Sequence, residues 1–224
     1  EGETDEAGAA SLTAIGSANA LTVDVAERHD IASEQTFSGD VDARATTRAG
    51  IVHGTAVTTT SAIGNAASVI NDTGMDAEID QTAEDGSSVS ATSELEVGSY
   101  AISSVTTATA TANAYDAVSY GGENDHALRQ DSGADVTADS YVLAPTGGLG
   151  YAASVIAAAN GNSAQIQGYY MGPDQIADID QDNRGDVTAR ASAESGGGAV
   201  SGCVATCESL GCLLRVRRLG RGLV

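Results

Sequence analysis

The stretch from Val105 to Val118 reads V-T-T-A-T-A-T-A-N-A-Y-D-A-V. Alanine occupies every second position from Ala108 to Ala114, and threonine or asparagine fills the positions between. Successive side chains of a β-strand point to opposite faces, so this order places alanine on one face and polar groups on the other. Alanine favours helices, but β-branched threonine at every second position favours a strand. The stretch therefore predicts a strand with one buried face.

Weaker copies of this stretch recur about every 49 residues along the chain, and a second unit alternates with them. The second unit contains a glutamine, a break with glycine, and a strand of the form Val-x-Ala. Equivalent residues at fixed steps would lie above one another in stacked strands and form Asn and Gln ladders. The expected corner and ladder residues are Gly16, Gly64, Asn65, Asn113, Gly161 and Asn162 in the first unit, and Gln35, Gln81, Gln130, Gln181, Gly39, Gly86, Gly133 and Gly185 in the second.

This double repeat predicts an all-β solenoid of about four 49-residue repeats, each made of two strand-turn-strand halves. One coil per half would give eight or nine rungs in a rod about 40 Å long. A stacked β-meander or sandwich is the alternative. Because small apolar residues alternate with polar ones, we expect the following side chains to point inward: Ala108, Ala110, Ala112, Val41, Ala43, Val89, Ala91, Val136, Ala138, Val187 and Ala189.

The organisation of the chain follows from where the repeat begins and decays. Residues 1–10 are acidic and lack periodicity, so they are expected to be a flexible leader. Residues 11–200 form a single β-repeat domain. Residues 201–224 form an atypical tail that contains all three cysteines and four of the ten arginines. The sequence leaves open whether this tail is a cap, an interaction segment or an altered C-terminus.

The net charge of −21 is extreme, and none of the basic residues is lysine. Such a chain repels nucleic acid and anionic membranes, so neither is an expected partner. No stretch has the length and apolar composition of a transmembrane helix. The acidic start without Met would suit a secreted chain after removal of a signal peptide, or a trimmed one. The late, odd set of cysteines predicts no disulfide framework.

The candidate chemistry is sparse, and the chain is not expected to be an enzyme, because no catalytic or nucleotide-binding motif is present. Asp178, Asp180 and Asp182 have the alternating spacing of calcium ligands, so Ca²⁺ is the one candidate cofactor. An EF-hand would need glycine at Asn183 and glutamate at Ala189. The other interpretation is a solvated strand face. The three isolated histidines, His29, His53 and His126, are expected at the surface or at corners.

The run Q-D-S-G-A-D-V-T-A from Gln130 to Ala138 resembles the repeat of curli-type surface amyloid subunits. The alternation of Ala/Thr/Gly-Asn units with Gln…Gly-Asp-Val-x-Ala units is more similar to the alphaproteobacterial holdfast anchor proteins. This similarity covers about residues 10–200. It implies a secreted, extracellular protein of the cell surface that tethers an adhesive polysaccharide, and it brings no catalytic residue with it.

Two functions follow as hypotheses. The first is a secreted structural subunit of an extracellular fibre or adhesive anchor, a homo-oligomer that assembles head-to-tail because an open stack leaves strand edges unpaired. The second is a carbohydrate-binding or carbohydrate-cleaving β-helix, for which seven tyrosines are the only aromatic material besides one Phe. The expected assembly ends are opposite in charge: Glu1, Glu3, Asp5 and Glu6 at one end, and Arg215, Arg217, Arg218 and Arg221 at the other.

Overall fold

The computed structural model describes residues 1–99, 102–148, 152–169, 175–197, 203–207 and 212–218. Its strands form three sheets in which all neighbours pair in parallel. Sheet A contains β1 (Gly2–Ala7), β4 (Asp40–Val52), β7 (Ser88–Ser99), β10 (Asp135–Gly148), β13 (Val187–Gly197) and β15 (Cys212–Arg218). Sheet B contains β2 (Ala10–Val25), β5 (Thr55–Asn71), β8 (Ser103–Ser119), β11 (Ala152–Gly168) and β14 (Cys203–Cys207). Sheet C contains β3 (His29–Phe37), β6 (Met75–Ala83), β9 (Asn124–Ser132) and β12 (Gln175–Asn183).

The chain visits the sheets in the order B, C, A and then begins the next coil, which confirms the predicted all-β solenoid. A whole repeat makes one coil, because Val57 pairs with Val105 in the coil above it. The expectation of one coil per half-repeat, with eight or nine rungs, is therefore wrong. The two halves lie side by side within one coil, and the six strands of sheet A span only about 24 Å along the stack.

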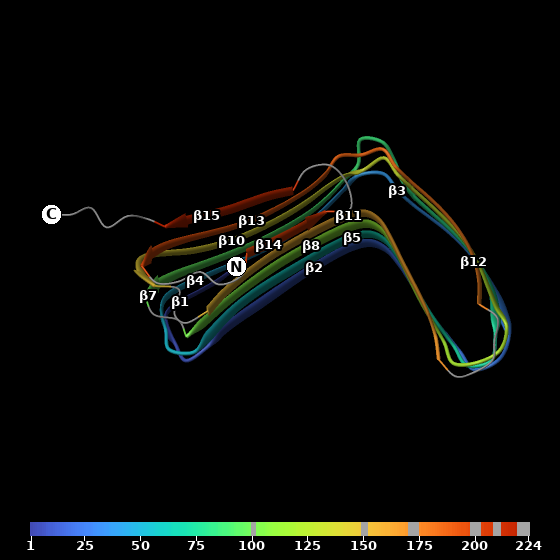
Figure 1. Cartoon of the computed structure of the whole chain (residues 1–224), viewed down its shortest axis with the longest axis horizontal. Helices are drawn as coiled ribbons and strands as arrows, with labels where there is room; N and C mark the ends of the chain where they lie inside the picture. The colour runs from blue at the N-terminus through green and yellow to red at the C-terminus, as the bar shows by residue number, and fades with distance from the viewer. Residues whose placement is uncertain (100–101, 149–151, 170–174, 198–202, 208–211, 219–224) are drawn as a thin grey trace.

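Each coil is bent into two arms, which Figure 1 shows from along the stack. In the long arm, sheet A covers the first half of sheet B; in the short arm, sheet C faces the second half. The strands of sheet B pass through the bend without a break. In β5 the buried positions alternate up to Ala62, then the neighbours Gly64 and Asn65 are both buried, and alternation resumes at Ala67. This reversal of phase turns the inner face through the elbow.

Small side chains fill the interior of the long arm, and larger ones fill that of the short arm. All the residues expected to point inward are buried, so that prediction is confirmed. The long arm contains one cluster made mostly of alanine and valine. The short arm contains a second cluster with larger side chains, including Met75, Ile79, Leu128 and Tyr115. His126 is also buried, within β9, and its Nδ1 lies 2.8 Å from the Tyr115 hydroxyl. The expectation of a surface or corner position is therefore wrong for His126.

The first and last described strands continue the solenoid. Gly2–Ala7, expected to be a flexible leader, is strand β1 and pairs with β4 through residues such as Glu3, which lies beside Arg48. In the tail, β14 pairs with β11 and β15 pairs with β13. The sequence pattern fails there because alternation over five to seven residues is too short to stand out from neighbouring glycine and serine.

Candidate functional site: amide ladders and open edges

A column of asparagine side chains runs through the elbow from coil to coil. The Nδ2 of Asn19 donates to the Oδ1 of Asn65 at 2.8 Å, and Asn65 donates in the same way to Asn113 at 2.8 Å. Asn113 then donates to Asn162, also at 2.8 Å. Each Nδ2 donates a second hydrogen bond to a backbone carbonyl at the end of sheet C, such as Thr82 O at 2.9 Å for Asn65. The column therefore joins successive coils and also joins sheet B to sheet C.

A column of glutamines on sheet C lies beside it and points in the opposite direction. Gln81 donates to the Oε1 of Gln35 at 2.8 Å, Gln130 to Gln81 at 2.7 Å, and Gln181 to Gln130 at 2.5 Å. The same amides donate to carbonyls of sheet B, for example Gln81 to Ala114 O at 3.0 Å. Buried amides need hydrogen-bond partners. If one coil slipped by one residue against the next, the amides of both columns would lose their partners at that step.

The expected corner glycines lie at two kinds of position. Gly64 is in the elbow, where an added Cβ would lie 2.2 Å from the Phe37 ring, and Gly161 is close to Asn183. Gly39, Gly86, Gly133 and Gly185 lie in the connections between sheets C and A, and Gly86 has a positive φ of 82°. Gly16 is different. It pairs with Ala62, two residues before the elbow.

Gly16 was expected at a corner and Asn19 was missed because the repeat length counted for the first coil was wrong. Counting from Gly16 to Gly64 gives 48 residues, but the first coil is 46 residues long, as the pairing of Asn19 with Asn65 shows. The spacing of Gln35 and Gln81 carries the correct step of 46 residues and would have located Asn19.

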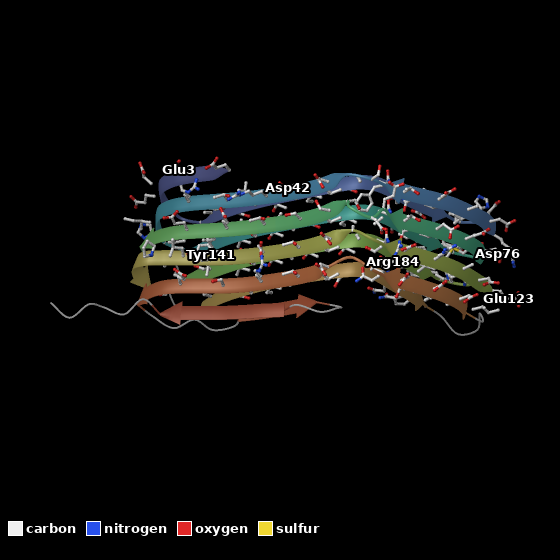
Figure 2. The ribbon with its side chains drawn as sticks, turned by 90° about the horizontal axis from the view of Figure 1, so that it is seen from above. Glu3, Asp42, Asp76, Glu123, Tyr141 and Arg184 are labelled. Carbon is white, nitrogen blue, oxygen red and sulfur yellow. The ribbon has the colours of Figure 1, made fainter. Side chains whose placement is uncertain are left out.

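Arginines on the outer faces connect carboxylates of neighbouring coils. Arg28 binds Asp76 at 3.1 Å and Arg44 binds Glu94 at 2.9 Å, each with both carboxylate oxygens. Arg184, labelled in Figure 2, binds Asp131 at 2.7 Å. Hydrogen bonding and attraction to these carboxylates raise the pKa of all three guanidinium groups. The partners are 48 to 53 residues apart, so aligning the repeats would have paired them.

The expected calcium ligands lie on β12, where Asp178, Asp180 and Asp182 are exposed. Asp182 lies 3.7 Å from Arg184. Within the described ranges, no group of three or more His, Cys, Asp or Glu side chains is close enough to hold a metal ion. The arrangement is that of an acidic strand face.

The tyrosines do not form one row on a face of the part that the structure describes. Tyr115 is buried, Tyr141 lies half-buried on sheet A, and Tyr120 and Tyr169 stack on each other with ring centroids 5.4 Å apart. Tyr100, Tyr151 and Tyr170 lie outside the residues whose side chains are described. These four described tyrosines therefore do not form a sugar-binding platform of aromatic rings along the solenoid.

The open edges of the sheets are the remaining candidate site. β1 and β15 are the first and last strands of sheet A, and β3 and β12 are the first and last of sheet C. On β1 and just before it, Glu1 pairs with Arg48, and Glu6 lies 2.9 Å from His53. Glu3 and Asp5 lie on the same strand. Arg215, Arg217 and Arg218 lie on β15 at the opposite edge, and Arg221 lies outside the described residues.

Comparison with known proteins identifies the family of this chain. The part of the chain that the structure describes contains no helix long and apolar enough to cross a membrane. No curated protein and no solved structure shows significant similarity. A family described as Holdfast attachment protein D, however, matches residues 4–211, nearly the whole solenoid, and this agrees with the stacked, repetitive fold and supports a cell-surface adhesive role. The chain belongs to the holdfast attachment protein D family.

Proposed function

We propose that this chain is a secreted structural subunit of an adhesive anchor on the cell surface, and that its copies join head-to-tail by strand addition. The family supports the attachment role. One observation supports the assembly: among the described strands, β1 and β15 each pair on one side only, and they are the two edges of the same parallel sheet. An edge strand offers a row of unpaired N–H and C=O groups to another chain.

The charges on these two edges favour one order of joining. The β1 edge is acidic, with Glu3 and Asp5, and β15 contains Arg215 and Arg217. Attraction between exposed groups is screened by salt, so it guides the encounter, and the backbone hydrogen bonds supply most of the affinity. The same contact repeated without closure produces a fibre. The material that the fibre holds at its outer end is, in this proposal, a surface polysaccharide, and the role is structural rather than catalytic.

The proposal is tested by exchanging charges between the ends. Glu1→Arg, Glu3→Arg, Asp5→Arg and Glu6→Arg together make both ends basic. Arg215→Glu, Arg217→Glu, Arg218→Glu and Arg221→Glu together make both ends acidic. Each variant alone should assemble more slowly than the original chain, and an equal mixture should recover because unlike ends meet again. Electron microscopy and light scattering at low salt measure this, and high salt should reduce the differences.

Deletion of residues 1–10 or of residues 203–224 provides a second test. The first deletion removes edge strand β1, and the second removes β14 and β15, the last strands of sheets B and A. Each should reduce fibre formation, while a β-type far-UV circular dichroism spectrum persists. Fibres from both deletions at the original rate, or an original chain that stays monomeric at high concentration, would contradict head-to-tail joining.

A further inference from the structure

The outer face of sheet B in the long arm carries no charge on its four long strands. Side chains there alternate with the buried Ala56, Thr58, Thr60 and Ala62, and so point away from the core. The outward residues are Ser11, Thr13, Ile15 and Ser17 on β2, Val57, Thr59, Ser61 and Ile63 on β5, Val105, Thr107, Thr109 and Thr111 on β8, and Ser154, Ile156, Ala158 and Asn160 on β11. We call this set the neutral face.

The opposite side of the same arm is highly charged. Figure 2 shows the outer face of sheet A, where Asp42 and Tyr141 are labelled. Its outward positions include Asp40, Asp42, Arg44, Arg48, Glu94, Glu96, Asp135, Asp139, Arg190 and Glu194. In a chain with a net charge of −21, a continuous patch without one acidic group is a marked departure from the rest of the surface.

The neutral face is regular and uncovered by any other described element. Its strands run side by side through the long arm (Figure 1), and they pack only on sheet neighbours and on the core side. Threonines follow one another across strands, as in Thr13, Thr59 and Thr107. Ile15 is 75% exposed on this face and Ile156 is 36% exposed. Short β-branched side chains on an even sheet are suited to packing against a second sheet about 10 Å away.

The charge distribution of the chain indicates a second copy of the chain as the partner of the neutral face. Two copies of a strongly acidic chain repel each other wherever their charged faces approach, but not where two neutral faces meet. The face has no aromatic ring, and the residues that line the described hollows, such as Asp76 and Gln35, are elsewhere. Neither these hollows nor an aromatic ring therefore gives a small ligand a site on the described residues of this face. We propose that the neutral face packs against the neutral face of a second copy, related by a two-fold axis.

The size of the face determines how strong this pairing is. Four strands and about seven residues of each give roughly 19 Å by 23 Å, or about 450 Å² per copy. The total of about 900 Å² is below the usual size of a stable protein pair, so two single subunits associate weakly. Subunits joined end to end would present many such faces in a row, and their contacts would add. This inference goes beyond head-to-tail joining: it is a lateral contact on a different surface.

The test places charges at the centre of the neutral face. Thr107 lies on one of the two middle strands, so in a two-fold pair it lies close to its own counterpart. Thr107→Lys and Thr107→Glu each bring like charges together and should weaken pairing by roughly tenfold or more. An equal mixture of the two variants should pair again. Sedimentation velocity over a wide range of concentrations measures the paired fraction, and mass per length measures it in any fibres that form.

Thr137→Lys and Thr137→Glu are the matched controls, because Thr137 is a half-buried outward threonine on a central strand of sheet A. They should pair like the original chain. The Thr107 and Thr137 variants all keep the original ends. If head-to-tail joining did not occur, the Thr107 variants should therefore still differ in lateral pairing from the Thr137 variants. If the original chain, both Thr107 variants and their mixture sediment alike, the proposal is overturned. It is also overturned if Thr107 variants lose binding to a soluble neutral glucan without any change in pairing.

Discussion

Asp139 shows how a single carboxylate responds to its position on the outer face of sheet A. Partial burial raises its pKa, and the nearby Arg190 guanidinium only partly opposes this. The two side chains are 3.6 Å apart, an ion pair without a hydrogen bond to Oδ1. Since the pKa is higher in the folded chain than in the unfolded one, folding favours the protonated form. This contribution is complete below about pH 4 and is lost as the pH rises through the raised pKa.

We therefore expect Asp139→Asn to be more stable than the original chain at pH 7, because asparagine is never ionised. The difference should shrink as the pH falls through the raised pKa of folded Asp139, and it should be smallest below about 4, the ordinary pKa of the acid in the unfolded chain. Urea unfolding at a series of pH values measures both stabilities. Asp42→Asn, an exposed acid on the same face, controls for the loss of one negative charge. A less stable Asp139→Asn at pH 7 would show that attraction to Arg190 outweighs burial.

Most inward-pointing residues could be predicted from the sequence, because alternation of small apolar and polar residues is a local pattern. Ala110, Val136 and Ala189 are examples. His126 was expected at the surface or at a corner although it alternates in phase with the buried Leu128. Its contact with Tyr115 could not be predicted, since Tyr115 comes from another sheet. The calcium hypothesis for Asp178 depended on the same alternation, which an acidic strand face produces as well.

At the scale of elements, the amide columns fix which strands are neighbours. Asn113 is fully buried, accepts from Asn65 and donates to Asn162 and to Asp131 O. Asn19 begins the column, is partly exposed and has no asparagine below it in the described chain. Buried groups left without partners cost more than exposed ones, because water cannot replace the lost hydrogen bonds.

Asn113→Ala should thus lower the free energy of unfolding by about 2–4 kcal/mol, and Asn19→Ala by only about 1 kcal/mol. Urea unfolding followed by circular dichroism measures both, and Asn19→Ala is the matched control for losing the same side chain. Equal losses for the two variants would contradict this expectation. They would mean that the hydrogen bond from each amide to a backbone carbonyl provides the stability, and that the hydrogen bonds between successive asparagines add little.

The number of coils per repeat could not be predicted from the sequence. Both half-repeats place small residues inward, so stacking the halves or setting them side by side satisfies the alternation equally well. The elbow adds to the ambiguity, because β5 reverses its buried phase at Gly64 and Asn65 without interrupting the strand. The repeat itself was visible because equivalent residues such as Gln81 and Gln130 lie one coil apart and meet directly.

At the scale of the whole molecule, stacking equal residues also stacks equal charges. Asp30, Asp76 and Asp125 follow one another on sheet C. Arg28 neutralises part of this column through Asp76. Repulsion among the remaining carboxylates opposes the fold, and dissolved ions screen it.

Stability should consequently rise with ionic strength, and calcium should do no more than sodium once ionic strength is matched. Thermal unfolding in sodium chloride and in calcium chloride of equal ionic strength measures this. Extra stabilisation by calcium that disappears in Asp178→Asn would contradict the expectation and identify a specific ion site on β12.

Every described strand runs parallel to its neighbours, and the three sheets contain six, five and four described strands. The two ends of the described stack therefore differ: the open strands are β1, β2 and β3 at one end, and β15, β14 and β12 at the other. In the head-to-tail fibre proposed above, all subunits would run the same way, so the fibre would have a direction and two unequal tips. Its tips should elongate at different rates, and only one of them can face the cell when the other faces outward. In this proposal, the direction of the fibre follows from the parallel course of the backbone in every described coil.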